Sequence, residues 1–472
     1  MLSLFNTLSG KKEVLRPLVK GKVKLFVCGL TVYDYAHIGN ARTYIVFDAF
    51  ARYLRSIGLN VFYLQNVTDI DDKIIKRAQE QGILPKELAK KFEKIYREDC
   101  KTLGISGITK YARATGNIAE IISQTRRLLK KGYAYAVEGD GVYYDISKFK
   151  GYGKLAHRTA RQAEDGVSRI DESVHKRNKG DFALWKISKQ GEPQWSFTAV
   201  QEGSAVRMDG RPGWHIEDTA ITEKYFGSQY DIHGGARDLI FPHHEAEIAQ
   251  MEAISGKSPL ARYWMHGGFL TVNGEKMSKS LGNFITIRDF LAKHSPRILR
   301  MLALKAHYRS PIDYSDTMIF QTQKELERVD EFVDKLKQKS RLKTDTRYKI
   351  QDTKYNFLKA LEDDFNTPKA FAVIFELISR VNPQLSKGLV GEKDKQNILA
   401  FLKDADKILK CIFWGREKTE KVPADIVELA EQREVFRKHK EWEKADEARK
   451  DIETRGWTVQ DTSGGYFLKK AQ

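Results

Sequence analysis

Two short segments of the sequence combine residues that suit the binding of a triphosphate. His37-Ile38-Gly39-Asn40 follows an apolar, β-branched stretch, and Lys276-Met277-Ser278-Lys279-Ser280 comes much later in the chain. A histidine and an amide beside a glycine can donate hydrogen bonds to a phosphate that approaches the backbone closely. The two lysines and their serines make a compact cationic clamp for β- and γ-phosphates. Each segment alone is also typical of an ordinary turn or a solvated basic loop, so their joint occurrence is what indicates ATP chemistry.

A second group of residues has the donor atoms of a zinc site. Cys28 ends the apolar stretch before His37, and His243 and Glu247 follow Pro242 four residues apart. That spacing places the histidine and the glutamate on one face of a helix, which we expect the proline to open. A thiolate, an imidazole and a carboxylate that converge can ligate zinc. A core cysteine and a surface His–Glu hydrogen bond remain the alternative interpretation.

The elements that position these residues follow a β-α-β pattern. Val23–Tyr33 reads as a buried parallel strand, and the next helix should carry an apolar stripe and end at Gly58. A second strand is predicted at Val61–Val67 and a second helix at Asp71–Gln81. This succession predicts a parallel sheet with its ligand at the carboxyl ends of the strands.

Composition sets broader limits. The 472 residues are too many for one core, and a hydrophobic content of 41% supports several packed domains. The net charge of +18 favours a polyanionic partner, although a lysine-rich enzyme with an evenly solvated surface would show the same excess. Three widely spaced cysteines argue against a disulfide framework. With no secretory leader or apolar run of membrane-spanning length, we expect a cytoplasmic protein that has no membrane partner.

Longer segments resemble cysteinyl-tRNA synthetases, which belong to the class I aminoacyl-tRNA synthetases. The resemblance covers essentially the whole chain, and the two phosphate motifs are the class signatures. The segments that carry it are Phe26–Asp34 with His37–Asn40, Asn66–Lys73, Asp181–Lys186, Gly210–Glu217, Asp231–Gly235, Phe241–Glu245, Ala360–Pro368, and Glu443–Asp446 with Arg449.

The resemblance implies an α/β fold with a Rossmann-type parallel sheet, an insertion, a helical bundle and a small anticodon-binding domain. We place the first half of the catalytic domain at 1–115 and its second half at 206–265, on either side of a connective insertion at 116–205. The remaining predicted domains are a stem-contact region with the lysine motif at 266–315, a helical bundle at 316–416 and an anticodon-binding domain at 417–472.

The resemblance also implies activation of L-cysteine with ATP and Mg²⁺, followed by transfer of cysteinyl to the 3′-terminal adenosine of tRNA-Cys, by a monomer. His37, Asn40, Lys276 and Lys279 would be the catalytic residues. Gly29, Gly39 and Asp238 would join His37, Asn40 and Lys279 in binding ATP, while Thr68 and Trp214 would line the cysteine pocket. No strong general base is required, because the substrate carboxylate is already a nucleophile.

Members of this family hold one zinc ion that selects cysteine over serine, through two cysteines, a histidine and a glutamate. Cys28, His243 and Glu247 match three of these positions, but Asp218 replaces the second cysteine. We expect zinc to be retained, with Asp218 as a ligand or near-ligand. Three ligands with Asp218 outside them, or a protein without tightly bound zinc, are the alternatives. A second departure is the segment from Trp195 to Met208, which is longer than usual and has no assigned role.

The C-terminal residues mix cationic, stacking and acceptor groups, which by themselves also suit an amphipathic helix pair with a solvated basic face. The resemblance implies that they contact single-stranded anticodon bases. The candidates are Arg433, Arg437, Trp442, Arg449, Trp457 and Asp461. This unit argues against one alternative function, a ligase that joins cysteine to a small amine as in the mycothiol pathway. A catalytically silent tRNA-binding paralogue is the other alternative, and the intact His37, Lys276 and Lys279 oppose it.

Overall fold

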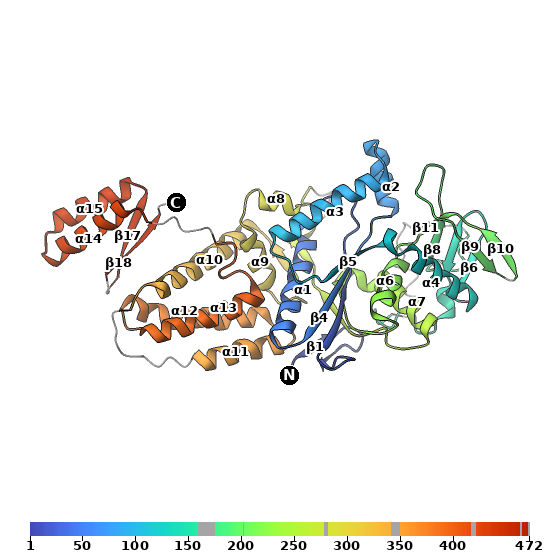
Figure 1. Ribbon diagram of the computed structural model, residues 1–472, viewed down its shortest axis with the longest axis horizontal. Helices are drawn as coiled ribbons and strands as arrows, with labels where there is room; N and C mark the ends of the chain where they lie inside the picture. Colours follow the sequence, from blue (N-terminus) through green and yellow to red (C-terminus); the bar gives the residue numbers. More distant parts are fainter. Residues whose placement is uncertain are drawn as a thin grey trace. The chain divides into compact units, whose positions relative to one another are not determined.

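A parallel five-stranded sheet is the centre of the catalytic half. The computed structural model describes residues 1–158, 175–201, 203–277, 282–340, 350–416, 422–462 and 465–470. The strand order is β13–β12–β3–β4–β5, with all neighbours parallel, and β4 and β5 are labelled in Figure 1. The predicted α/β class is therefore confirmed. The strands are β3 (Lys22–Val27), β4 (Asn60–Val67), β5 (Lys110–Arg113), β12 (Tyr230–Ala236) and β13 (Ala261–Gly267).

The order of the strands fixes where a ligand can bind. From β3 the chain continues to β4 and β5 on one side, whereas β12 and β13 lie on the other side. The carboxyl ends of β3 and β12 are therefore the switch point of the sheet, which is the usual ligand site of such folds. The predicted strand Val23–Tyr33 was too long, because β3 ends at Val27. Beyond it the regular pairing is interrupted, and Leu30 and Val32 then pair with Thr68, the residue after β4.

Helix α1 (Ile38–Ser56) packs on the sheet and starts at the predicted phosphate turn. The contact is close: a Cβ on Gly234 of β12 would lie 2.4 Å from the Phe47 ring of α1. Gly58 has a φ of +88° just after the helix, as expected for a C-terminal stop. Helix α2 (Asp72–Gln81) begins one residue later than predicted, because Asp71 caps it by accepting a hydrogen bond from the Lys73 N–H.

A second sheet is formed mainly by the predicted insertion, 116–205, and its strand β11 follows that segment. Its order is β11–β8–β7–β6, all antiparallel, and the long segment after Trp195 forms a separate hairpin of β9 and β10. Their bounds are β6 (Ala134–Val137), β7 (Gly141–Tyr144), β8 (Phe182–Ile187), β9 (Thr198–Gln201), β10 (Ser204–Arg207) and β11 (Gly210–Pro212).

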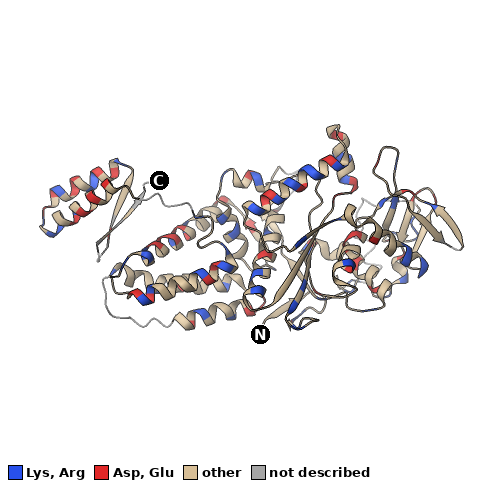
Figure 2. Ribbon diagram, viewed as in Figure 1, with Lys and Arg blue, Asp and Glu red and all other residues tan. Residues whose placement is uncertain are grey.

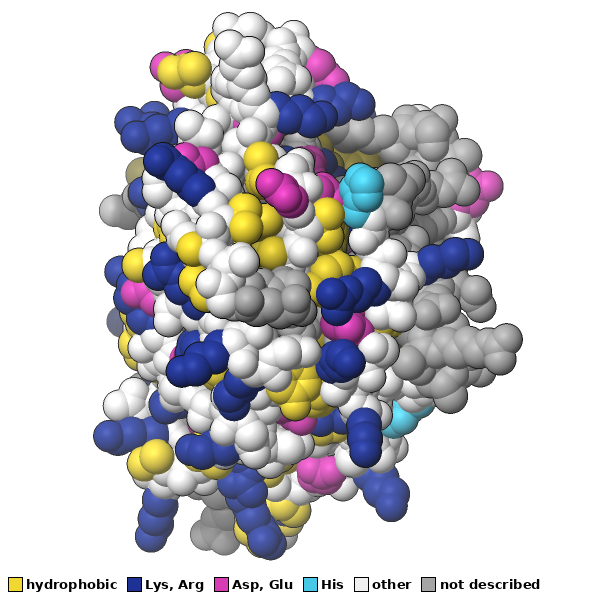
Figure 3. Space-filling model, turned by 90° about the vertical axis from the view of Figure 1, so that its right-hand side faces the viewer, with side chains coloured by type: hydrophobic (Ala, Val, Ile, Leu, Met, Phe, Trp, Pro, Cys, Tyr) yellow, Lys and Arg dark blue, Asp and Glu magenta, His cyan; other side chains and the backbone are white. Residues whose placement is uncertain are grey.

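Lys and Arg side chains are spread over the face shown in Figure 3, with Asp and Glu between them.

The other elements of this unit surround the two sheets. Strands β15–β14–β16 form a small sheet, and β1 with β2 form a hairpin. These strands are β1 (Ser3–Asn6), β2 (Lys11–Val14), β14 (Leu270–Val272), β15 (Glu275–Lys276) and β16 (Ile312–Tyr314). The helices are α3 (Pro85–Thr102), α4 (Ile118–Lys130), α6 (Ile216–Phe226), α7 (Glu245–Ser255), α8 (Ile287–Leu291) and α9 (Pro296–Leu304).

The chain forms two compact units. The first comprises Met1–Phe320, Lys359–Pro368 and Lys407–Lys410, and the second comprises Gln321–Leu358, Lys369–Asp406 and Cys411–Gln472. The helices of the C-terminal half are α10 (Asp316–Lys337), α11 (Ile350–Glu362), α12 (Thr367–Ser386), α13 (Glu392–Leu409), α14 (Ala424–Lys438) and α15 (Trp442–Thr454), followed by β17 (Trp457–Thr462) and β18 (Gly465–Lys470). Both charge signs occur along α14 and α15 (Figure 2). Within the described ranges, no helix has the length and apolar character needed to span a bilayer.

Candidate active site

A hollow of about 250 Å³ opens at the carboxyl end of β3. One stretch of chain, from Cys28 to Tyr44, supplies most of its lining, and the turn after β12 closes the opposite side. The predicted nucleotide residues Gly29, His37, Asn40 and Asp238 all line it. Gly39 is not among the lining residues, but a Cβ at this position would lie 2.9 Å from the His37 ring. The residue types and the position at the sheet edge suit a nucleotide.

His37 is held in one orientation by the helix that it caps. Its Nδ1 accepts a hydrogen bond from the Asn40 N–H at 3.2 Å, and the Asn40 side-chain oxygen accepts one from the His37 N–H at 3.1 Å. Burial lowers the pKa of His37 to about 4, although the nearby Asp238 carboxylate acts in the opposite direction. The ring is therefore neutral at neutral pH. Since Nδ1 is an acceptor, the ring proton lies on Nε2, which is free to donate.

The lysine motif starts from a hairpin beside this turn. Lys276 is the last residue of β15, and the next residue, Met277, would lie 3.5 Å from a Cβ on Gly39. Lys279 and its flanking serines lie outside the described residues. After them the chain returns to the same turn, where the Ile38 N–H donates to the Ile285 oxygen at 3.1 Å. Met277 and Ile285, on either side of the undescribed residues of the motif, therefore both lie against the start of α1.

Four buried side chains predicted as metal ligands come together beneath the hollow. The donor atoms of Cys28, Asp218, His243 and Glu247 lie within 4.8 Å of one another. His243 Nε2 is 3.0 Å from an Asp218 oxygen and 3.4 Å from a Glu247 oxygen, and Cys28 Sγ is 3.9 Å from that glutamate. The helix is not opened directly by Pro242, because α7 begins at Glu245 and a π-helical turn, Ile240–His244, precedes it. His243 and Glu247 still converge.

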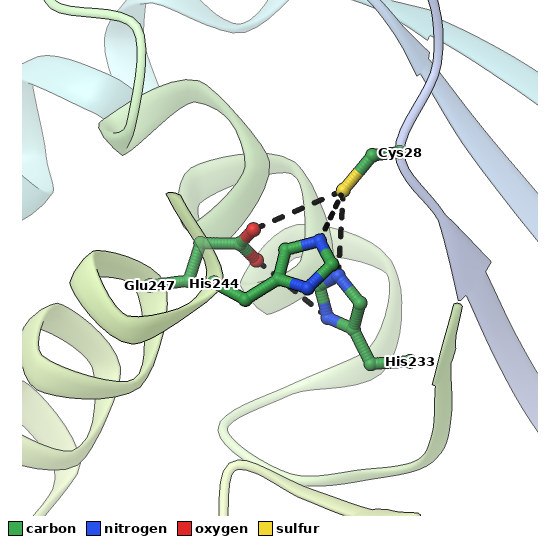
Figure 4. A group of neighbouring side chains, drawn as sticks. All are labelled: Cys28, His233, His244 and Glu247. Atoms are coloured by element: carbon green, nitrogen blue, oxygen red, sulfur yellow. Dashed lines mark hydrogen bonds and ion pairs between the residues drawn. The ribbon is translucent and has the colours of Figure 1, made fainter. Parts of the chain in front are cut away.

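Two further histidines give a second donor set that shares Cys28 and Glu247. His244 Nε2 and His233 Nε2 lie 3.1 and 3.4 Å from Cys28 Sγ, and Figure 4 shows all four side chains pointing toward one another. The second ring nitrogen of each histidine also has a partner, Tyr230 for His233 and His266 for His244. Such partners orient an imidazole toward a metal. The motifs containing these histidines are recognisable in the sequence, but no spacing rule singles them out as donors.

The electrostatics of this cluster favour a cation. Burial, and then the neighbouring carboxylates, raises the pKa of the Cys28 thiol, and the same two causes raise the pKa of Glu247. One oxygen of Asp218 and one of Glu247 are buried with no hydrogen-bond partner in the described part of the chain. Ligand atoms of a tetrahedral zinc lie about 3.3–3.8 Å apart, which is close to the observed separations. The donor set and its unpartnered oxygens therefore fit a divalent cation.

The two predicted pocket residues, Thr68 and Trp214, do not line the hollow. Trp214 stacks on His243, with ring centroids 4.3 Å apart and planes at 16°. Thr68 is buried and donates its hydroxyl to Glu217, a carboxylate that also accepts from Asn66 at 3.3 Å. Sequence reasoning missed Glu217, although its position beside Asp218 in a recognised motif was a usable signal. It also missed Lys73 and Phe284, which do line the hollow.

The C-terminal candidates are not equivalent. Asp461 binds the Arg433 guanidinium through both oxygens, at 2.6 and 2.9 Å, and also pairs with Arg437. Arg449 pairs with Glu453 at 3.0 Å, and Trp457 lies in the core of this region. Trp442 is 58% exposed. Of the six candidates, Trp442 is therefore the residue whose aromatic face is most available to a base.

Comparison with known proteins agrees with this geometry. The family model of the class I tRNA synthetase (C) catalytic domain matches residues 14–324, and the DALR domain model matches residues 356–411. The chain belongs to this family. Among its relatives, the cysteine–tRNA ligases of Thermococcus gammatolerans and Carboxydothermus hydrogenoformans are each 43% identical to it over 99% of its length and 99–100% of theirs. The recognition as a cysteinyl-tRNA synthetase family member is thus confirmed.

Solved structures of other class I synthetases share the fold. A methionyl-tRNA synthetase of Mycobacterium tuberculosis in complex with methionyl-adenylate superposes with a TM-score of 0.55 at 16% identity, over 83% of this chain and 90% of its own. A LeuRS–tRNA–LeuAMS complex of Agrobacterium radiobacter superposes with a TM-score of 0.60 at 11% identity, over 85% of this chain and 86% of its own. At these identities the likeness shows that the chain shares the fold of these structures, and it carries no information on substrate.

Proposed function

We propose that this protein is a cysteine–tRNA ligase, which activates L-cysteine with ATP and transfers the cysteinyl group to the 3′-terminal adenosine of tRNA-Cys. One observation carries the proposal together with the family membership. Cys28 belongs both to the lining of the hollow and to the buried donor cluster. A small substrate seated beside the nucleotide turn can therefore extend its side chain to the cluster.

The residues of the turn can stabilise the charge that develops on ATP. The neutral His37 donates through Nε2, and the start of α1 adds the positive end of its dipole. Gly29, Gly39 and Asp238 would contact the rest of the nucleotide, and Lys276 and Lys279 the β- and γ-phosphates, with Mg²⁺ accompanying them. The substrate carboxylate attacks the α-phosphate, so rate comes from positioning and charge stabilisation.

The donor cluster is the proposed site of one zinc ion, held by Cys28, Asp218, His243 and Glu247. Bound there, zinc would supply a centre that binds a thiolate far better than a serine hydroxyl. The stacking of Trp214 on His243 fixes the plane of that imidazole, and His215 occupies its second nitrogen at 2.9 Å. The alternative set through His233 and His244 has similar separations, and Asp218 distinguishes the two because it belongs only to the first.

Three measurements test this function. We expect ATP–pyrophosphate exchange that requires cysteine and is weak with serine, charging of tRNA-Cys, and one zinc per chain. Lys279→Ala should slow the exchange severely while the circular dichroism spectrum stays unchanged. Exchange without any preference for cysteine, or unchanged exchange in Lys279→Ala, would contradict the assignment. Charging of a small amine in place of tRNA would favour the small-amine ligase.

The C-terminal unit is proposed to bind tRNA through Trp442. Stacking of a base on an aromatic ring contributes about 1–3 kcal/mol, so Trp442→Ala should raise the KM for tRNA-Cys by roughly 10- to 100-fold. Cysteine-dependent exchange, which needs no tRNA, should stay unchanged. Val435→Ala is a matched control, because Val435 is also apolar and is 51% exposed on α14. Equal effects of the two substitutions would remove Trp442 from the interface.

We further propose that the protein acts as a monomer in the cytoplasm. The three cysteines, all in the described ranges, are buried and form no disulfide, which suits a reducing compartment. Light scattering at micromolar concentration would test the monomer, and a mass near twice 54.2 kDa would contradict it.

A further inference from the structure

Helix α1 carries a buried arginine, Arg42, just after the phosphate turn. It is 3% exposed, and its two terminal nitrogens donate only to backbone carbonyls. No carboxylate lies within ion-pair distance of it in the described ranges. The acceptors are the oxygens of Gly268 and Phe269, both at 2.7 Å, of His307 and Tyr308, both at 3.4 Å, and of Ser310.

These carbonyls belong to two segments that lead into the small sheet. Gly268 and Phe269 precede β14, and His307 to Ser310 precede β16. The two strands run parallel, with Leu270 opposite Ile312, and β15 pairs with β14 and ends at Lys276. The segments also touch directly, since a Cβ on Gly268 would lie 2.4 Å from the Ser310 oxygen. The guanidinium thus joins the segment that leads into the β14–β15 hairpin, from which the lysine motif starts, to the segment that leads into β16.

Burying a charged guanidinium without a carboxylate costs free energy, which indicates that Arg42 has a particular role at this position. Burial lowers the pKa of Arg42 to about 10, so the group stays charged at neutral pH without a neighbouring carboxylate to balance it. Only a guanidinium offers enough N–H donors, in a fixed planar fork, for several carbonyls at once. A lysine would keep the charge but not the geometry.

We propose that Arg42 is a positioning residue for adenylate formation, which sets the hairpin bearing Lys276 against the turn bearing His37. This inference rests on the proposed function of the lysine motif. The motif acts on pyrophosphate during the first step, whereas transfer to tRNA follows after pyrophosphate has left. Loss of Arg42 should therefore affect the two steps unequally, which a general loss of stability would not do.

Arg42→Lys tests this inference, with Arg55→Lys as its matched control. Arg55 lies in the last turn of the same helix and also donates to backbone carbonyls, those of Val61 at 3.1 Å and Gly107 at 2.8 Å. We expect Arg42→Lys to lower the kcat of cysteine-dependent exchange by about 10²-fold, as for a misplacement of about 1 Å. The KM for cysteine and the single-turnover rate of transfer from preformed adenylate should stay near those of the unsubstituted protein.

Several outcomes overturn the proposal. One is an equal loss in both steps, and another is a loss no larger than that in Arg55→Lys. If Arg42→Lys does not fold, Arg42→Gln replaces it, and failure of both variants to fold overturns the proposal because the arginine then serves the whole fold.

A double variant separates this inference from the proposed function. If Arg42 acts through the lysine motif, Arg42→Lys should add little to the loss already caused by Lys279→Ala. Fully additive losses overturn the role of Arg42 alone. No loss in Lys279→Ala overturns the assigned role of the motif instead.

Discussion

The nucleotide hollow and the donor cluster share Cys28 but are built in different ways. The hollow is lined mainly by one stretch, from Cys28 to Tyr44, and it opens to solvent. The cluster takes its side chains from the residue after β3, from α6, from the turn before α7 and from α7 itself, and each of its members is at most 6% exposed. A site made by one continuous turn depends on local backbone geometry. A site gathered from distant elements depends on the whole sheet and on the charges that it encloses.

The largest effect should come from the residue that the two regions share. Cys28→Ala removes one of the proposed zinc ligands. When zinc binds less tightly, the buried carboxylates of Asp218 and Glu247 lack a cation to balance their charge. Zinc is the proposed binding partner of the substrate thiolate, so we expect its loss to lower cysteine-dependent exchange by about 10³-fold or more. Zinc content by atomic emission should fall with it. Cys100→Ala, a substitution of another buried cysteine, is the control. Full zinc content in Cys28→Ala would show that the cluster does not need this thiolate.

A substitution that displaces a residue of the hollow should act on catalysis alone. A Cβ on Gly39 would lie 2.9 Å from His37 and would displace that ring. We expect Gly39→Ala to reduce the exchange kcat by about 10²-fold, because a small displacement of a donor is costly, while zinc content stays normal. Gly116→Ala is the matched control, since a Cβ there has nothing within 4 Å. Loss of zinc in Gly39→Ala would show that the hollow and the cluster are not independent.

Two consecutive carboxylates on α6 can define the boundary of the cluster. Asp218 approaches His243, whereas Glu217 accepts hydrogen bonds from Thr68 and Asn66. We expect Asp218→Asn to weaken zinc binding by about 10- to 100-fold and Glu217→Gln to change it little, as measured by competition with a chelator. Both variants should keep normal ATP binding. The reverse order would exclude Asp218 as a ligand and would favour the set with His233 and His244.

The difference between the two regions also explains what could be predicted from the sequence. The turn from His37 to Asn40 was predictable because a local motif, a preceding strand and a following helix lie side by side in the chain. The end of β3 was not, because residues 28–33 are as apolar as the strand itself. Only the structure shows that the regular strand ends at Val27 and that Leu30 and Val32 then pair with Thr68, just after β4.

The donor cluster was reached through family resemblance, since periodicity related only His243 to Glu247. Nothing local relates Cys28 to Asp218, which are brought together by the packing of α6 and α7 around the end of β3. The same packing adds His233 and His244, whose roles no sequence rule assigned. The contact of Thr68 was also not predictable from the sequence, because only the fold shows that its hydroxyl donates to Glu217.

The smallest expected effect concerns the pH dependence of the free energy of unfolding. His37 and Glu247 should contribute to this dependence with opposite signs. Burial lowers the pKa of His37 from 6.5 to about 4, so the unfolded chain binds more protons than the folded protein between these values. Stability from this group is therefore present above pH 6.5 and is lost as the pH falls. The pKa of Glu247 is raised, so in metal-free protein its contribution is lost as the pH rises.

Between about pH 6.5 and 5.5 His37 should cost the protein about 1 kcal/mol of unfolding free energy, and His37→Asn should remove that loss while still capping α1. Urea unfolding at the two pH values measures the difference. Equal losses in the unsubstituted protein and in His37→Asn would mean that the ring is not held neutral. The hollow would then lack the fixed Nε2–H donor on which its assigned chemistry depends.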